Sequence, residues 1–264
     1  TKNKAQFGGA IFNSNYLEIK DSSFKENKAT AYGGAIYNNN TLTIDNTTFD
    51  NNASSYGGAL FNSGYATITN TKFLNTKSVL HDAGGAIYNG ISLEVSDSEF
   101  TGNIARAFGG AIINYQISYF YSPITKSTSN TYTSNQAYYG GAVASYSGSF
   151  ISNNDTFTKN FAIQGGAIHN FSTVSIDDGK FESNSAYYGG GIFSQNTTGT
   201  TSTVTLEMTS VLFSLEITST TLVKLPVALV LAVTINLIEL PLTISVTFHL
   251  IEVLHIHLYL QISI

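Results

Sequence analysis

The sequence predicts an all-β fold, a right-handed parallel β-helix of about eight coils of 24 to 25 residues each. The first observation is a double glycine, followed by a small residue (Ala or Gly) and then an aliphatic one, which recurs eight times. Successive copies are 25, 24, 27, 25, 31, 25 and 24 residues apart, a period that indicates one short unit repeated and stacked. The copies begin at Gly8, Gly33, Gly57, Gly84, Gly109, Gly140, Gly165 and Gly189.

A second landmark recurs in the same units, an aromatic residue with Asn three positions later, about eight or nine residues before the next double glycine. Phe73 is the exception, because Asn75 follows it one place early. The regular pairs are Phe24/Asn27, Phe49/Asn52, Phe100/Asn103, Tyr132/Asn135, Phe157/Asn160 and Phe181/Asn184.

Between the landmarks, apolar and polar residues alternate, as in Leu17-Glu18-Ile19. This period of two indicates short strands with one buried face, and three such strands fit in each unit. The handedness follows from the usual rule for parallel crossovers.

Parallel strands about 4.8 Å apart place each repeat position above its counterpart in the next coil. The position three after the first glycine is always aliphatic, and with the repeated aromatic residue it is predicted to form the interior. This column comprises Ile11, Ile36, Leu60, Ile87, Ile112, Val143, Ile168 and Ile192.

Two polar columns accompany the aliphatic one. Asn in register can bond the side-chain amide above and below, so we expect the first column to satisfy itself when buried. It comprises Asn13, Asn38, Asn62, Asn89, Asn114, Ser145, Asn170 and Ser194. The second lies three positions before the aromatic residue and suits turns in which the side chain caps nearby backbone. It comprises Asp21, Asn46, Asn70, Asp97, Ser129, Asn154 and Asp178.

Two other repeat architectures fit the sequence less well. The blades of a β-propeller need about 40 residues or more, whereas these units have about 25. A leucine-rich horseshoe needs regular leucine columns and a helical segment in each unit, and the repeats have neither.

Over residues 1 to about 199, the GGAI segment followed by an aromatic residue and Asn, alternating with FxxN, resembles two families. These are the passenger repeats of chlamydial polymorphic outer membrane proteins and the adhesin-like surface proteins of methanogenic archaea. The resemblance implies a surface-displayed β-helix for adhesion, with no catalytic residues. The sequence departs from the pattern at Phe73, at Ala144 and Ser145, and beyond residue 199.

The amino-acid composition argues against one class of partner, nucleic acids. Only 11% of residues are charged and the net charge is −5, which argues against nucleic-acid binding, because no Lys/Arg stripe is present to neutralise phosphates. Without cysteine, stability must come from stacking. The sequence begins at Thr1 with the repeat already under way by Phe7, so we expect a fragment or a processed chain whose membrane attachment lies in parts outside it.

Two regions are predicted, a repeat domain over residues 1–199 and an atypical hydrophobic tail over residues 200–264. All 23 glycines lie at or before Gly199. The uncharged stretch Leu225 to Ile238 is shorter than the roughly 20 residues that a spanning helix needs. Two alternatives remain for the tail: strands that continue or cap the coil, and a reading-frame slip. Codons compatible with Ser214 to Pro226, read one base earlier, can encode a ninth coil, so the DNA sequence would decide between these alternatives.

Parallel β-helices also include pectate lyases and glycoside hydrolases, which use clustered acidic and basic residues, so such an enzyme is the alternative function. The adjacent acids Asp177 and Asp178 are better explained as a turn before Phe181. We therefore predict no catalytic residues and no cofactor.

Histidines do not change this expectation. His81 and His169 are predicted to be tolerated surface residues. His249, His255 and His257 invite a metal site only if the tail is in frame, and no cysteine or acidic partner stands at ligand spacing, so no metal is predicted.

Two features remain as candidate ligand contacts. The first is a column of aromatic residues, Phe12, Tyr37, Phe61 and Tyr88, which would form a ladder for sugars or proteins if it faced outward and would otherwise shield the coil edge. The second is the insertion between Tyr115 and Asn130, which contains Tyr119, Phe120 and Tyr121. A loop on a rigid scaffold is a common site of recognition.

The resemblance, together with these candidate contacts and the absence of a predicted catalytic cluster, implies a secreted or cell-surface, adhesin-like module that binds and is not an enzyme. Its expected partner is a protein or glycan on the surface of a host or neighbouring cell.

Overall fold

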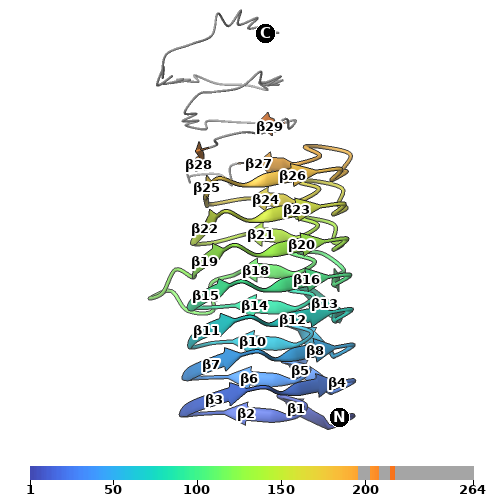
Figure 1. Cartoon of the computed structure of the whole chain (residues 1–264), viewed down its shortest axis with the longest axis vertical. Coiled ribbons are helices and arrows are strands. Elements are labelled where there is room, and N and C mark those ends of the chain that lie inside the picture. The colour runs from blue at the N-terminus through green and yellow to red at the C-terminus, as the bar shows by residue number, and fades with distance from the viewer. Residues whose placement is uncertain (196–202, 208–214, 218–264) are drawn as a thin grey trace, which may run out of the picture.

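The computed structural model describes residues 1–195, 203–207 and 215–217, and every regular element among them is a β-strand. The strands stack in parallel along one long axis, with the N-terminus at one end (Figure 1). The predicted parallel β-helix is therefore confirmed.

Four parallel sheets run along the stack. The first sheet contains β1 (Lys4–Phe7), β5 (Lys28–Tyr32), β9 (Ala53–Tyr56), β13 (Lys77–Ala83) and β17 (Ile104–Ala105). The second sheet contains β2 (Ile11–Asn13), β6 (Ile36–Asn38), β10 (Leu60–Asn62), β14 (Ile87–Asn89), β18 (Ile112–Asn114), β21 (Val143–Ser145), β24 (Ile168–Asn170), β27 (Ile192–Ser194) and β29 (Leu215–Ile217).

The other two sheets complete the coils. The third sheet contains β3 (Tyr16–Lys20), β7 (Thr41–Asp45), β11 (Tyr65–Thr69), β15 (Ser92–Ser96), β19 (Ile124–Thr128), β22 (Ser149–Asn153), β25 (Thr173–Asp177) and β28 (Thr203–Glu207). The fourth sheet contains β4 (Ser23–Lys25), β8 (Thr48–Asp50), β12 (Lys72–Leu74), β16 (Glu99–Thr101), β20 (Thr131–Thr133), β23 (Thr156–Thr158) and β26 (Lys180–Glu182).

The sequence predicted three strands per coil, and the first sheet supplies a fourth. Its strands lie just before the double glycines; β1 and the first four residues of β5 alternate polar and apolar residues, whereas β9 (ASSY) does not. Beyond β17 this sheet continues only as isolated parallel bridges, such as Phe108 with Tyr139. The register in this sheet is also irregular, since the pairing of β1 with β5 shifts between Ala5 and Phe7.

The aliphatic and aromatic columns fill the interior as predicted. Ile36, Leu60, Ile87 and Ile112 are each fully buried, and Ile11 at the N-terminal end packs against the same core. In the fourth sheet the rings of Phe49, Phe73, Phe100, Tyr132 and Phe157 stack nearly parallel, with centroids 4.8 to 4.9 Å apart. Each ring thus covers its neighbours' faces, which explains why one aromatic residue recurs in each unit.

The first predicted asparagine column is a hydrogen-bonded ladder. The Nδ2 atoms of Asn13, Asn38, Asn62 and Asn89 donate to the Oδ1 of the next member at 2.7, 2.8, 2.9 and 3.1 Å, ending on Asn114. The buried amides therefore satisfy one another through repetition.

The asparagine of the FxxN landmark forms a second ladder. In a regular coil, its backbone N–H and its Nδ2 both donate to the next Oδ1, as Asn135 does to Asn160 at 2.9 and 3.0 Å. Its Nδ2 also donates to an aromatic carbonyl in the preceding coil, Phe100 in this case, at 2.9 Å. Thr76 occupies this position in the irregular coil and donates to Asn103 through both its backbone N–H and its hydroxyl group.

The column predicted to form turns has left-handed backbone throughout. Its members have φ between 45° and 55°, a region that Asn and Asp tolerate better than most residues. They are Asp21, Asn46, Asn70, Asp97, Ser129, Asn154 and Asp178.

One interior polar column contains an acid. Asp155 is fully buried, and its Oδ2 accepts a hydrogen bond from the hydroxyl of Ser152 at 2.6 Å. Burial raises the pKa of this carboxyl group to about 6, although neighbouring hydrogen bonds from serine hydroxyls and from Asn130 oppose that effect. Nearby, the hydroxyl groups of Ser127 and Tyr132 are 2.7 Å apart in the same interior.

The predicted division at residue 199 lies outside the described residues. β28 pairs in register with β25, and β29 pairs with β27, so these two short segments extend the third and second sheets. The proposed frame slip over Ser214 to Pro226 and the three histidines of the tail lie mostly or wholly outside the described residues.

Candidate binding site

The loop between β18 and β19 projects from one flank of the stack (Figure 1). It comprises residues 115–123, because Ile124 already begins β19 in register with Ser92 of β15. The insertion predicted between Tyr115 and Asn130 is therefore shorter than expected, since its second half is a regular strand of the coil.

Both ends of this loop are fixed to the scaffold. The backbone N–H of Tyr115 donates to Asn89 O at 3.1 Å, and that of Ile124 donates to Ile91 O at 2.8 Å. Pro123 is buried, and its carbonyl accepts from Ser149 N at 2.8 Å. The loop therefore leaves and rejoins a rigid stack at defined points.

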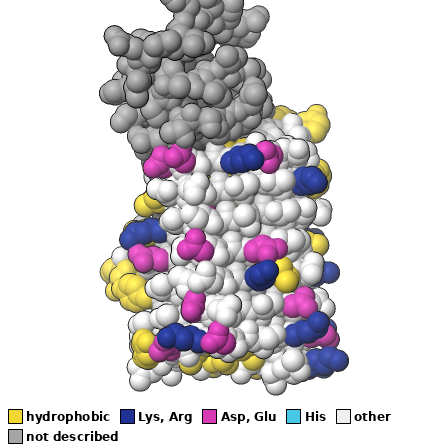
Figure 2. Space-filling model, viewed as in Figure 1, with side chains coloured by type: hydrophobic (Ala, Val, Ile, Leu, Met, Phe, Trp, Pro, Cys, Tyr) yellow, Lys and Arg dark blue, Asp and Glu magenta, His cyan; other side chains and the backbone are white. Residues whose placement is uncertain are grey.

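The tip of the loop exposes three consecutive aromatic side chains. Tyr119 and Phe120 are 101% and 90% exposed, and Tyr121 is 52% exposed. A tight turn shapes the tip, because Tyr121 N donates to Ser118 O at 3.3 Å and Phe120 N donates to the Ser118 hydroxyl at 3.3 Å. In the same orientation, Figure 2 shows hydrophobic side chains gathered on the flank where this loop projects.

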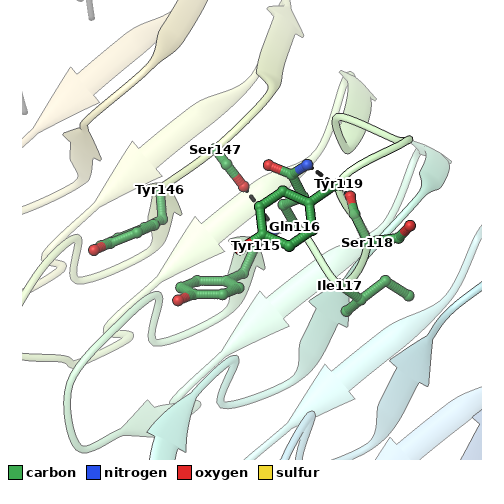
Figure 3. A pocket seen from close by; sticks show the side chains of 7 residues that line it. All are labelled: Tyr115, Gln116, Ile117, Ser118, Tyr119, Tyr146 and Ser147. Atoms are coloured by element: carbon green, nitrogen blue, oxygen red, sulfur yellow. Dashed lines mark hydrogen bonds between the residues drawn. The ribbon is translucent and has the colours of Figure 1, made fainter. Parts of the chain in front are cut away.

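A shallow cavity of about 310 Å³ lies at the base of the loop (Figure 3). The loop and the turn after β21 line it together. The lining residues are Tyr115, Gln116, Ile117, Ser118, Tyr119, Tyr146 and Ser147. Figure 3 shows the Tyr119 ring beside Gln116, whereas the rings of Tyr115 and Tyr146 lie side by side with their hydroxyl groups directed away from the loop.

Two hydrogen bonds orient the polar groups of the cavity. The backbone N–H of Gln116 donates to the Ser147 hydroxyl oxygen at 2.6 Å, which joins the loop to the next coil. The Gln116 side-chain Nε2 donates to Ser118 O at 2.6 Å, which fixes the plane of the amide. Opposite them, the Ile117 side chain packs close to Gly90, where a Cβ atom would come within 2.8 Å of it.

The predicted aromatic ladder is present, and its rings face one another. Phe12 and Tyr37 have centroids 4.8 Å apart, Tyr37 and Phe61 5.3 Å, and Phe61 and Tyr88 4.6 Å, all stacked. Phe12 is 54% exposed, whereas Phe61 and Tyr88 are only 6% exposed. The ring faces are thus largely occupied, and the inner members offer a ligand little surface.

The ladder is covered by aromatic residues that precede the double glycines. Tyr32 lies 4.6 Å from Phe61 between ring centroids, and Tyr56 meets Tyr88 edge-on at 5.8 Å. Together they form a second apolar cluster outside the main core. This arrangement agrees with shielding of the coil edge.

Where the ladder column changes to Ile113 and Ala144, other rings fill the space. Tyr115 and Tyr146 stack at 4.8 Å, and Tyr146 contacts Phe171 at 4.9 Å. Tyr146 and Ser147 were not predicted from the sequence as neighbours of the loop. The signal was available, because Asn114 and Ser145 align in register and so their following residues, Tyr115 and Tyr146, must also be adjacent.

His169 was expected at the surface, and this prediction is wrong. Its side chain is fully buried in the ladder column, stacked on Phe171 with ring centroids 3.9 Å apart. Its Nε2 lies 3.1 Å from the Gln164 side-chain oxygen, while its Nδ1 is buried with no hydrogen-bond partner. Burial lowers the pKa of this imidazole to about 3. The sequence left open whether this column faces outward or shields the coil edge, and the rings of Phe171 and Phe193 enclose it at His169.

On the face seen in Figure 2, charged side chains are scattered over a largely uncharged background, and several charged side chains of the described residues form ion pairs. Lys126, the nearest charged residue in sequence to the loop, pairs with Glu94 at 2.7 Å. Within residues 1–195 and the two short described segments beyond, no group of three or more His, Asp or Glu side chains is arranged to hold a metal ion. Nor does any helix in this part of the chain have the length and apolarity to cross a membrane.

Comparison with known families supports the fold. Residues 1–122 match the family model described as a right-handed β-helix region. Neither the search of curated proteins nor the search of solved structures found a match.

Proposed function

We propose that this protein is an adhesin-like binding module, secreted or displayed at a cell surface, in which the β-helix is a scaffold and the loop 115–123 contacts the partner. One observation carries this proposal: Tyr119, Phe120 and Tyr121 are exposed at the tip of a loop that the repeat does not require. The module acts by binding and performs no catalysis.

The exposed rings at the loop tip contribute little to the stability of the stack. Each coil contacts its neighbours, so residues at the tip of a projecting loop add little to folding. Exposed aromatic side chains are costly in water, yet they provide large contact area at low entropic cost when a partner covers them. Tyrosine is also enriched among residues that dominate binding energy.

The partner is a protein or glycan on a host or neighbouring cell. A net charge of −5 and few basic residues disfavour nucleic acid. The resemblance to chlamydial and archaeal surface-protein repeats supports the cell-surface location.

Replacement of all three aromatic residues tests the proposal. The triple variant Tyr119→Ser, Phe120→Ser, Tyr121→Ser should reduce attachment to target cells at least tenfold and leave the circular-dichroism spectrum and melting temperature unchanged. Substitution is preferable to deletion through Ile124, because that residue belongs to β19.

The matched control replaces exposed tyrosines elsewhere, Tyr65→Ser with Tyr187→Ser. This variant should attach like the wild type. Full attachment by the folded triple variant, or equal loss in both variants, would refute the role of the loop.

A separate assay tests the absence of catalysis. Incubation with polygalacturonate, xylan and β-glucan should release neither reducing ends nor unsaturated uronates. Release that increases with protein concentration would favour a polysaccharide lyase or hydrolase.

A further inference from the structure

We infer that the cavity at the base of the loop is a binding site for one ring of a neutral sugar. This inference rests on the proposed function and specifies its ligand class. The cavity's volume of about 310 Å³ lies at the lower end of the range of small-ligand sites, roughly 300–1,000 Å³, and suits a single monosaccharide unit.

Charge selects a neutral ligand. None of the seven lining residues is Asp, Glu, Lys, Arg or His, and the flanking Lys126 is already paired with Glu94. A uronate, sialate or phosphate group would therefore lose water without gaining a counter-ion, which is unfavourable.

The polar groups match vicinal hydroxyls. With Nε2 bound to Ser118 O, the Gln116 amide is held in one orientation, and its Oε1 accepts no hydrogen bond from the described residues. The Ser147 hydroxyl oxygen accepts from Gln116 N, so its proton remains available to donate. One oriented acceptor and one donor from adjacent coils can thus bind neighbouring sugar hydroxyls, which both donate and accept.

An unstacked ring supplies the apolar wall. Tyr115 and Tyr146 cover one another, whereas Tyr119 contacts no other aromatic ring among the described residues and lies over the cavity beside Gln116 (Figure 3). The C–H face of a pyranose ring can pack on that free face, as apolar surfaces do on aromatic rings.

The test is a titration by isothermal calorimetry and saturation-transfer NMR, with methyl glycosides of glucose, galactose and mannose and with N-acetylglucosamine. Glucuronate and sialic acid serve as charged comparators. At least one neutral sugar should bind saturably, and the charged sugars should bind at least tenfold more weakly. Tyr119→Ala and Gln116→Met should each weaken binding of the neutral sugar at least tenfold, with unchanged melting temperature. The control Tyr187→Ala should bind like the wild type.

Three results would overturn the inference. The first is that no neutral sugar binds, and the second is that the Tyr119→Ala and Gln116→Met variants bind the neutral sugar as tightly as the wild type does. The third is that a charged sugar binds more tightly than every neutral sugar. A different outcome is that the protein binds phosphatidylcholine vesicles or a deglycosylated cell-surface protein through this loop while it binds none of the sugars. That result would also reject the sugar site and would assign the aromatic tip to another class of partner.

Cell attachment separates this inference from the proposed function. If the serine triple variant loses attachment but no sugar binds, the loop is an adhesive site with a different ligand, and only the sugar inference fails. If a neutral sugar binds as described but attachment is independent of the loop, the sugar site stands and the adhesive function fails.

Discussion

Asn130 and Asp155 occupy the same interior column of neighbouring coils, and the backbone N–H of Asn130 donates to Asp155 Oδ1 at 2.8 Å. The column thus accommodates an amide in one coil and a carboxyl group of nearly the same shape in the next. Of these two residues, only Asp155 has an ionisable side chain, and that side chain is fully buried.

Asp155→Asn should stabilise the protein at neutral pH. Because burial raises the folded-state pKa to about 6 from 3.8, the folded state binds more protons than the unfolded state between these values. The free energy of unfolding of the wild type therefore falls as pH rises from about 4 to about 6, by an amount on the order of 2–3 kcal/mol. Urea denaturation at pH 4, 5, 6 and 7 should show this fall in the wild type and its absence in the variant. A variant less stable than the wild type at pH 7 would contradict the assignment of Asp155 as a buried acid.

His169→Phe should remove an opposite pH dependence. The folded-state pKa of about 3 lies below the ordinary 6.5, so the unfolded state binds more protons between these values, and stability falls as pH decreases from about 6.5 toward 3. Phe already occupies this column at Phe61 and Phe193, and its ring removes the unpartnered Nδ1. Thermal melts between pH 4 and pH 7 should show a smaller acid-induced decrease in melting temperature than the wild type. An unchanged acid profile would mean that another group causes the decrease.

Thr76→Asn should stabilise the protein by repairing the FxxN ladder. Thr76 stands between Asn52 and Asn103 and lacks the carbonyl oxygen that accepts two hydrogen bonds in regular coils. Restoring that oxygen should add about 1 kcal/mol to the free energy of unfolding, measured by urea denaturation. The reverse change in a regular coil, Asn135→Thr, is the matched control and should destabilise by about 1–2 kcal/mol. Equal effects of the two substitutions would show that the ladder does not determine stability here.

Two glycines with the same backbone conformation should differ in their tolerance of alanine. Gly57 and Gly102 have φ of 64° and 66°. A Cβ at Gly57 would lie 2.1 Å from Leu60 O, which is fixed backbone, whereas at Gly102 the nearest atom is the Asn75 side-chain oxygen at 2.8 Å. Gly102→Ala should therefore cost about 1–2 kcal/mol, the penalty of the left-handed conformation. Gly57→Ala should cost more and lower the melting temperature further, as differential scanning fluorimetry can measure; similar melting temperatures would rule out the steric argument.

The fold could be predicted from the repeat because parallel coils place equivalent positions of successive repeats in one column. From this regularity the sequence predicted the burial of Ile36 and Ile87 and the amide ladder from Asn13 to Asn114. The loop tip was also predictable, since Tyr119 to Tyr121 lie where the interval lengthens to 31 residues.

Periodicity alone could not tell which side of a column is covered by a neighbouring segment. Phe61, Tyr88 and His169 share one column whose direction the sequence left open. Only the packing of Tyr32, Tyr56 and Phe171 against them shows that they are enclosed. The cavity likewise depends on contacts between coils, in which Gln116 from one coil is held by Ser147 from the next. The sequence by itself therefore determined the stack and its interior, because these repeat along one axis, whereas tertiary structure decided exposure and the cavity, because these depend on how non-repeating side chains pack across coils.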